Sequence, residues 1–479
     1  MNYAMVAYIT GWVLNIEAVF LILPCFVALL YGEKELGAFI LSVLLCMAFG
    51  VFLIRKKPAK KVLYMKEGYV TVALCWIVMS IMGALPFLFG QVISNPIDAL
   101  FETVSGFTTT GASILTEVES IPKCMLFWRS FTHWIGGMGV LVFLLTVLPM
   151  VGGCHMNLMK AESPGPSVSR LVPKVRSTAK ILYGIYIVMT LVQIILMLAG
   201  GMPLFDSVTT AFGTAGTGGF GIKNDSIAGY SVYLQVVVTV FMILFGVNFN
   251  IYFLMLAKKW NQALKCEELW WYLGIIGVSI LIIAWDIRGI YGNPSQAIQQ
   301  SAFQVGSIIT TTGFATADFN LWPQASRTVL VILMFIGACA GSTGGGIKVS
   351  RIIILLKTVR KELSQFLHPK GIKKIKMDGK NIEEEVVRIT NVYMVTYIMI
   401  FAFSILFLAI DEQDLITNFT AVAATFNNIG PGLELVGPSS NFALFSNPAK
   451  LVLIFDMLAG RLEIFPLLLL FVKDTWKRF

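Results

Sequence analysis

The sequence is poor in charged residues. Only 13% of its 479 residues are Asp, Glu, Lys or Arg, whereas 57% are apolar and the mean hydropathy is +0.78. A soluble globular domain carries about 25% charged residues, so that class is excluded. Apolar runs of the roughly 20 residues needed to cross a hydrocarbon core of about 30 Å recur along the whole chain. The sequence therefore predicts an all-α polytopic membrane protein.

Histidine and closely spaced cysteine are also scarce. The three histidines (His133, His155 and His368) show no metal-ligand spacing, and the seven cysteines are scattered, most of them in apolar runs. A thiol in such a run behaves as a small hydrophobe. We therefore expect no disulfide framework, no structural metal and no cofactor in this chain.

An enzyme would need reactive groups that the sequence does not gather. A membrane-embedded transferase, the distant alternative, requires clustered carboxylates or histidines at an interface. Because no such cluster recurs along the chain, we expect that the protein is not an enzyme.

The basic residues gather in a few stretches. Of the 36 Lys and Arg residues, 26 lie in residues 55–66, 152–180, 258–268 and 357–388 or after residue 472. The positive-inside rule places these stretches in the cytoplasm, together with both termini. The formal charge of +9 is thereby explained by topology, so nucleic acid is not an expected partner. About ten spans satisfy this arrangement: 4–31, 36–54, 68–90, 125–151, 181–200, 230–257, 269–291, 325–356, 389–411 and 447–472.

Four segments between these spans resemble one another. They are too apolar for exposed loops and too short to cross the membrane twice, so they are expected to be re-entrant. Aligned on one glycine, they read DALFETVSGFTTTGAS, DSVTTAFGTAGTGGFG, QSAFQVGSIITTTGFAT and TAVAATFNNIGPGLE, with the glycines at 111, 218, 313 and 430. Such internal repetition predicts four units with one organisation, each made of a span, a short helix, a glycine turn and a second span. The expected units are the hairpin 1–61 and repeats 1 to 4 at 62–180, 181–268, 269–388 and 389–479.

The short helices of three repeats begin near an aspartate. Asp98, Asp206 and Asp414 are expected N-caps, although ordinary loop aspartates are the competing interpretation. A carboxylate there complements the positive end of the helix dipole, so that the negative end points toward the glycine turn and favours a cation.

The glycine turns have a composition suited to cation binding. Non-helical backbone survives at membrane depth only where it is buried in protein or lines an aqueous path, and glycine adopts angles closed to other residues. Four such turns can present rings of carbonyl oxygens that replace the hydration shell of an alkali cation, and threonine hydroxyls can add ligands. The expected ion is bound at Thr110, Thr217, Thr312 and Ile429. The full set of expected ion-binding residues is Thr109, Thr110, Gly111, Thr217, Gly218, Thr311, Thr312, Gly313, Asn428, Ile429 and Gly430.

Two further features lie within apolar spans. The span 325–356 contains the motif AGSTGGGIK, whose glycines predict a broken helix, with close helix packing as the alternative. A phosphate loop is rejected because the order Gly-Lys-Ser/Thr is missing. Arg461 lies twelve residues before Lys473, roughly 18 Å along a helix, and is too deep to reach the interface easily. A positive charge beneath a cation site would be a barrier, and pairing with Asp456 or Glu463 is the alternative.

Acidic residues follow each turn within seven positions. They could concentrate cations at the outer mouth, although outer loops commonly carry charges. The residues concerned are Glu117, Asp225, Asp318 and Glu434.

The four turns, the paired spans and AGSTGGGIK resemble the Trk/Ktr/HKT family of potassium transporters over nearly the whole chain. The two spans before residue 55 are similar to the extra hairpin of the Trk-type membrane subunit. The resemblance implies potassium uptake across the bacterial inner membrane, with K+ as the transported ion and a preference for it where all four turns carry glycine. A sodium-coupled Ktr-type symporter is the alternative.

The resemblance also implies that four pseudo-symmetric helix–pore-loop–helix repeats surround one pore in each chain, in addition to the N-terminal helix hairpin. It further implies partners and a gate. The expected partners are a second copy of the chain in a homodimer, membrane lipid, and a cytosolic TrkA-like ring that binds the regulatory nucleotide. The gate is implied to be an intramembrane loop under the filter together with Arg461, and the loop comprises Gly341, Ser342, Thr343, Gly344, Gly345 and Gly346.

Overall fold

The computed structural model describes residues 1–58, 63–139, 175–369, 371 and 374–477. Helices make up most of this part of the chain, and one two-stranded antiparallel ribbon joins β1 (Lys376–Met377) to β2 (Lys380–Asn381). Six of the described helices are long and apolar enough to cross a membrane. The prediction of an all-α polytopic membrane protein is confirmed. The six helices are α1 (Tyr3–Tyr31), α2 (Leu36–Ile54), α3 (Met65–Phe89), α8 (Val175–Ala199), α13 (Glu267–Asp286) and α17 (Glu384–Leu408).

In repeats 2 and 3, the second span is not one straight helix. In repeat 2, α10 (Val232–Phe245) and α11 (Phe249–Leu256) meet at 88°. In repeat 3, α15 (Gln324–Ile336) and α16 (Val349–Leu367) are separated by a non-helical loop, as the glycine-rich motif predicted. The segment expected as the span 230–257 is therefore a bent pair of helices, and the predicted break within 325–356 is confirmed.

Repeats 1 and 4 show shorter pieces. The last span expected, 447–472, is divided into α19 (Asn447–Arg461) and α20 (Phe465–Leu468), because Glu463 and Ile464 have positive φ angles of 56° and 70°. In repeat 1, α5 (Lys123–Gly137) covers the first part of the expected span 125–151, and residues 140–151 lie outside the described part of the chain, as do Cys154 and His155.

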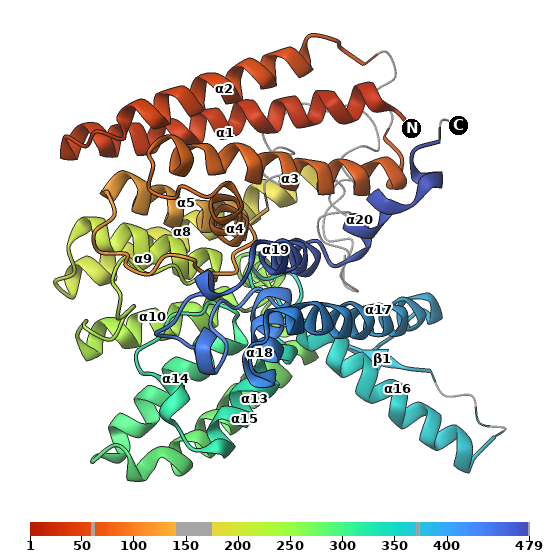
Figure 1. The fold of residues 1–479 in the computed structure, drawn as a ribbon. Helices are drawn as coiled ribbons and strands as arrows, with labels where there is room; N and C mark the ends of the chain where they lie inside the picture. The colour runs from red at the N-terminus through yellow and green to blue at the C-terminus, as the bar shows by residue number, and fades with distance from the viewer. Residues whose placement is uncertain (59–62, 140–174, 370, 372–373, 478–479) are drawn as a thin grey trace.

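Four short helices each precede a glycine turn, and they lie near the middle of the molecule (Figure 1). They are α4 (Pro96–Phe107), α9 (Leu204–Gly216), α14 (Pro294–Ile309) and α18 (Leu415–Phe426). Within the described residues, the other helical elements are α12 (Trp260–Leu264), η1 (Ile287–Gly289), η2 (Phe319–Leu321), η3 (Ala409–Asp411), η4 (Glu434–Val436), η5 (Phe442–Leu444), η6 (Leu469–Phe471) and η7 (Lys473–Thr475).

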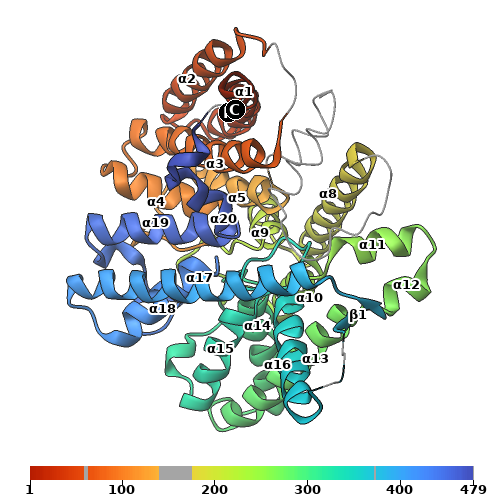
Figure 2. The ribbon, with the colours of Figure 1, turned by 90° about the vertical axis from the view of Figure 1, so that its right-hand side faces the viewer.

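The hairpin α1–α2 packs along α3 at one side of the bundle, while α16 lies toward the opposite side (Figures 1 and 2). The two ends of the chain lie side by side. The amino group of Met1 donates to the carbonyl oxygen of Lys477 at 3.2 Å, and Lys66 Nζ donates to that of Asp474 at 2.7 Å. Both termini therefore lie on the same side of the molecule.

Only one of the three expected aspartate caps is found. Asp414 is the N-cap of α18 and accepts from the amides of Ile416 and Thr417, both at 2.9 Å. Asp98 and Asp206 instead lie within the first turns of α4 and α9, because these helices begin earlier, after Asn95 and Pro203. Their carboxylates still lie at the positive end of the helix dipole.

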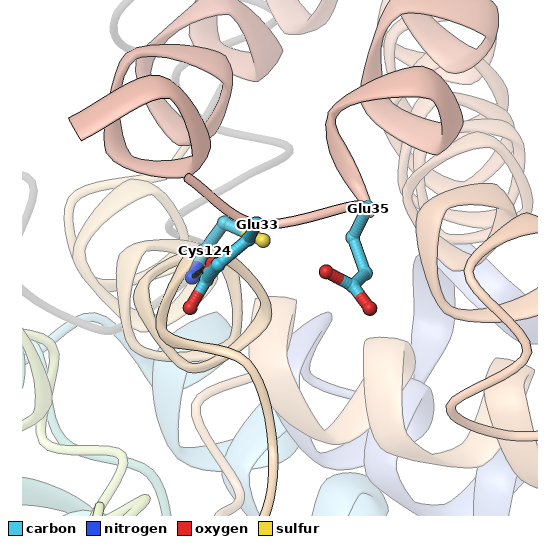
Figure 3. A group of neighbouring side chains, drawn as sticks. All are labelled: Glu33, Glu35 and Cys124. Carbon is cyan, nitrogen blue, oxygen red and sulfur yellow. Dashed lines mark hydrogen bonds between the residues drawn. The ribbon is translucent and has the colours of Figure 1, made fainter. Parts of the chain in front are cut away.

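A carboxylate in the hairpin turn caps α5. Glu33 accepts from the amides of Lys123 at 2.6 Å and Cys124 at 2.9 Å, which satisfies two free amides at the start of the helix. Glu35 lies nearby, and the potential ligand atoms of Glu33, Glu35 and Cys124 lie within 4.8 Å of one another (Figure 3). The hydrogen bonds of Glu33 show that this group of side chains joins the hairpin to α5 of repeat 1.

Candidate ion pathway

The four glycine turns share one backbone conformation. Each is a set of three residues, numbered here as turn 1 (109–111), turn 2 (217–219), turn 3 (311–313) and turn 4 (428–430). The first residue of each turn has a left-handed φ between 53° and 59°, and the third is a glycine with φ between 76° and 99°. The first residues are Thr109, Thr217, Thr311 and Asn428, and the third are Gly111, Gly219, Gly313 and Gly430.

The backbone hydrogen bonds follow the same pattern. In turn 1, the Thr109 amide donates to the carbonyl three residues back, and the Thr110 amide donates to the carbonyl five residues back. The other turns repeat both bonds through Thr217 and Gly218, Thr311 and Thr312, and Asn428 and Ile429. The four segments are therefore structural equivalents, as the sequence comparison predicted.

Turn 2 departs from the sequence alignment by one residue. The glycine equivalent to Gly111 is Gly219, not Gly218, and the middle position belongs to Gly218 rather than to Thr217. The alignment on Gly218 failed because two adjacent glycines fit the same letter pattern. The carbonyl oxygen equivalent to that of Thr110 is thus supplied by Gly218.

The four turns close into a ring, which we call the glycine ring (109–111, 217–219, 311–313 and 428–430). A Cβ atom added to Gly111 would overlap the carbonyl oxygen of Gly218 in the next repeat. The corresponding pairs are Gly219 with Thr312, Gly313 with Ile429, and Gly430 with Thr110. Two separate constraints therefore require glycine as the third residue of each turn. One is its positive φ angle, and the other is the carbonyl oxygen packed against its Cα.

Hydroxyl and amide side chains brace the glycine ring. The Thr110 hydroxyl lies 2.8 Å from that of Thr108, and the Thr312 hydroxyl lies 2.7 Å from that of Thr310. Asn428 Nδ2 donates to the Thr110 hydroxyl at 2.9 Å, which links turn 4 to turn 1. These threonine hydroxyls are thus held by contacts with other protein groups. The oxygens that all four turns share are the backbone carbonyls of their middle residues.

A buried ion pair supports turns 1 and 2. Glu102 on α4 and Arg129 on α5 are at most 4% exposed and lie 2.6 Å apart. Glu102 also accepts from the Ile114 amide at 3.0 Å, and Arg129 donates to the carbonyl of Gly221 at 2.8 Å. Because Ile114 follows turn 1 and Gly221 follows turn 2, the pair fixes the outer ends of both turns.

His133 makes a second link between the same turns. One ring nitrogen contacts the carbonyl of Gly106 at 2.8 Å, and the other accepts from the Phe220 amide at 3.2 Å. Sequence reasoning missed Glu102, Arg129 and His133. The available signal was their position as ionisable residues within membrane segments.

The loop 337–348 packs against the glycine ring. The Gly345 amide donates to the Thr311 hydroxyl at 2.6 Å, and a Cβ at Gly345 would lie 2.5 Å from the Asn427 carbonyl. On the side of repeat 2, the Phe249 amide donates to the Gly341 carbonyl at 3.0 Å. The loop thus contacts three of the four repeats around the axis of the ring.

Charged side chains hold this loop at its base. Glu268 is 2% exposed and accepts from the amides of Ala340 at 2.7 Å and Ser350 at 3.1 Å, one on each side of the glycines. Lys348 Nζ donates to the carbonyls of Gly344 and Gly345. The loop is therefore an ordered structure rather than a simple kink.

Arg461 ends α19 next to the loop. Its guanidinium donates to the carbonyl of Thr343 at 2.8 Å, to that of Gly137 at 2.9 Å and to the Thr109 hydroxyl at 3.3 Å. The acids considered as its partners make other contacts, since Glu463 forms an ion pair with Arg351 and Asp456 accepts from Ser404 at 2.9 Å.

The expected acidic mouth is uneven. Glu117 and Asp225 are exposed, whereas Glu434 pairs with Arg327 at 2.9 Å and Asp318 caps η2. The four carboxylates therefore do not form an equivalent set.

The fold and the comparisons with known proteins together define a polytopic membrane transport protein. The chain belongs to the TrkH family, described as cation transport proteins, whose profile it matches over residues 36–268 and 288–477. It is 35% identical to the Trk system potassium uptake protein TrkH of Salmonella typhimurium, over 100% of both chains. It is 32% identical to TrkG of Escherichia coli, over 98% of each chain. The crystal structure of the potassium transporter TrkH from Vibrio parahaemolyticus superposes with a TM-score of 0.89 at 31% identity, covering 100% of both chains.

Proposed function

We propose that this chain mediates potassium uptake through the glycine ring. The observation that carries the proposal is the closed contact of four glycines with four carbonyls of neighbouring repeats. Uncharged carbonyl oxygens replace the hydration shell of an alkali cation without holding it too tightly. The relatives' names, potassium uptake proteins, support K+ as the ion.

In this proposal the middle residues of the four turns supply the K+ ligands. These are the carbonyls of Thr110, Gly218, Thr312 and Ile429, with Gly218 taking the place first given to Thr217. The flanking residues of the turns shape the ring through their left-handed angles.

The gate in this proposal is the loop 337–348 together with Arg461. The loop contacts turns 3 and 4, and Arg461 donates to the loop carbonyl of Thr343 and to Thr109 of turn 1. A fixed positive charge below a cation site raises the free energy of an ion leaving it. Opening would require both the loop and the guanidinium to move.

The setting we propose is the bacterial inner membrane, with both termini in the cytoplasm. The adjacent chain ends support one common side for both termini, and the basic stretches support the cytoplasmic side. The division into a hairpin and four repeats, the homodimer and the TrkA-like nucleotide-binding ring belong to the same proposal. The packed hairpin α1–α2 favours the Trk type over a sodium-coupled Ktr-type symporter.

Rubidium flux into proteoliposomes tests the ring, with sodium and lithium as competitors. Gly313→Ser places a side chain against the Ile429 carbonyl and is expected to weaken the preference for rubidium over sodium. Gly184→Ser on α8 is the control, because nothing lies within 4 Å of a Cβ at that position. An unchanged ion preference in Gly313→Ser would contradict the assignment of the ring.

A further inference from the structure

Glu17 is a carboxyl group buried outside the ion pathway. It lies halfway along α1 and is 2% exposed. A Cβ added to Gly83 of α3 would lie 3.1 Å from Glu17 Oε1 and 3.1 Å from Thr103 of α4. The carboxyl group therefore lies where the hairpin meets α3 and the first short helix.

The surrounding contact is a continuous seam between α1 and α3. Thr10 Oγ1 lies 3.6 Å from Cys75 Sγ, and seven residues further along α1, Glu17 faces Gly83 of α3. The two helices thus run side by side in the same direction, as Figure 1 shows. Glu17 lies near the middle of this seam, far from both ends of a 29-residue helix.

No described residue forms a hydrogen bond with either carboxyl oxygen of Glu17. Ser80 Oγ and Trp76 Nε1 are also buried without a hydrogen bond in the described part of the chain, and they lie about one and two turns before Gly83 on α3. An ionised carboxylate in such a place is strongly destabilised by desolvation, and no hydrogen bond from a described residue offsets this cost.

The charged groups on the neighbouring helices make no contact with Glu17. On α2, the nearby titratable group is the buried thiol of Cys46. Glu102 of α4 is bound to Arg129 of α5. On the same helix α5, His133 contacts the backbone at Gly106 and Phe220. Among the described residues, Arg461 is a cation that approaches this seam: its guanidinium carbon lies 5.9 Å from the centre of the Trp76 ring, and it donates to Thr109 and to the carbonyls of Thr343 and Gly137.

We propose that Glu17 holds a proton, so that the seam between the hairpin and the pore contains a proton-binding site. The bound proton makes the group a neutral carboxylic acid where α1 faces Gly83 of α3. Removal of the proton at alkaline pH would place a bare charge in the seam and loosen the hairpin. This inference stands independently of the ion carried by the glycine ring.

Infrared spectroscopy of the purified full-length chain tests the proposal directly. A protonated carboxylic acid has a C=O stretching band separate from that of a carboxylate. The difference spectrum of wild type minus Glu17→Gln is expected to contain the acid band at neutral pH. Glu102→Gln is the matched control, because it removes a buried carboxylate in an ion pair and is expected to leave the acid band unchanged.

Thermal unfolding at a series of pH values supplies the second measurement. Glu17→Gln is expected to match the Tm of wild type at neutral pH and to lose part of the decline that wild type shows at alkaline pH. Glu102→Gln is expected to lower Tm at neutral pH. The proposal is overturned if the wild-type minus Glu17→Gln spectrum lacks the acid band. It is also overturned if Glu17→Gln unfolds or loses stability as Glu102→Gln does, because glutamine is a neutral isostere of a protonated glutamate and should not lower Tm at neutral pH.

Discussion

The guanidinium of Arg461 and the carbonyl oxygen of Thr343 lie 2.8 Å apart, in a hydrogen bond that joins the end of α19 to the loop 337–348. The bond connects repeat 4 to repeat 3 next to turn 1 of the glycine ring. The same guanidinium contacts Gly137 and Thr109 of repeat 1. The side chain of Arg461 therefore connects repeats 1, 3 and 4.

Replacing Arg461 with alanine is expected to increase ion flux. At an effective dielectric constant of about 20, two unit charges a few ångströms apart repel by roughly 3 kcal/mol. Loss of the guanidinium removes this barrier and also frees the Thr343 carbonyl. Rubidium flux into proteoliposomes should rise by about tenfold or more, which corresponds to about 1.4 kcal/mol of the barrier.

Arg327→Ala is the control for this variant. It removes the same type of side chain from an ion pair with Glu434 at the outer side of the molecule. Equal flux in Arg461→Ala and wild type would mean that the arginine has only a structural role.

The register of turn 2 can be tested at Gly219. Gly219→Ala introduces a Cβ that overlaps the Thr312 carbonyl and forces alanine into a left-handed conformation, which costs roughly 1–2 kcal/mol by itself. We expect rubidium flux to fall by about tenfold or more. Gly277→Ala on α13 has open space around its Cβ and should retain the flux of wild type. Wild-type flux in Gly219→Ala would place the critical glycine elsewhere.

Replacing only one partner of the ion pair between Glu102 and Arg129 is expected to destabilise the protein more than replacing both. Arg129→Met leaves a buried carboxylate without its partner, which typically destabilises a protein by about 3–5 kcal/mol. The double variant Glu102→Gln with Arg129→Met should recover much of this loss. Thermal unfolding of the two single variants and the double variant measures the coupling. Additive effects in that cycle would argue against a direct interaction.

Asp414 links stability to acidic pH. The hydrogen bond from the Thr417 hydroxyl is the main cause that lowers the pKa of Asp414 below its usual value, and the amides of Thr417 and Ile416 add to it. Its stabilising contribution is therefore present above the unfolded pKa of about 3.9 and is lost as the pH falls through the lower folded value. Asp414→Ala should cost about 1 kcal/mol at neutral pH and less below pH ~3. The free energy of unfolding, measured for wild type and Asp414→Ala at both pH values, checks this prediction. Asp414→Asn serves as a variant that retains the cap.

The sequence was sufficient to locate the four turns because glycine and threonine are conspicuous between apolar spans. It could not separate Gly218 from Gly219, since the choice depends on φ angles and on the distant Thr312 carbonyl. The loop in repeat 3 was predicted from adjacent glycines. The bends in repeats 2 and 4 had no such signal, and Ile464 adopts a positive φ that no sequence rule would assign to a β-branched residue.

Long-range contacts explain the other differences. Asp98 was expected to cap α4, but it pairs at 2.6 Å with Lys450, a residue 352 positions away. The partners considered for Arg461 were nearby in sequence, whereas the observed contacts come from turn 1, α5 and the loop 337–348. Local spacing identified which residues were unusual, and only the packing of four repeats determined what they contact.

The contacts of the glycine ring run in one rotational direction. Each glycine abuts the carbonyl of the following repeat, from Gly111 to Gly218 and finally from Gly430 back to Thr110. A substitution in one repeat therefore displaces an oxygen that belongs to its neighbour. The four repeats therefore cannot vary independently at these positions. A substitution in one repeat affects the following repeat before the preceding one.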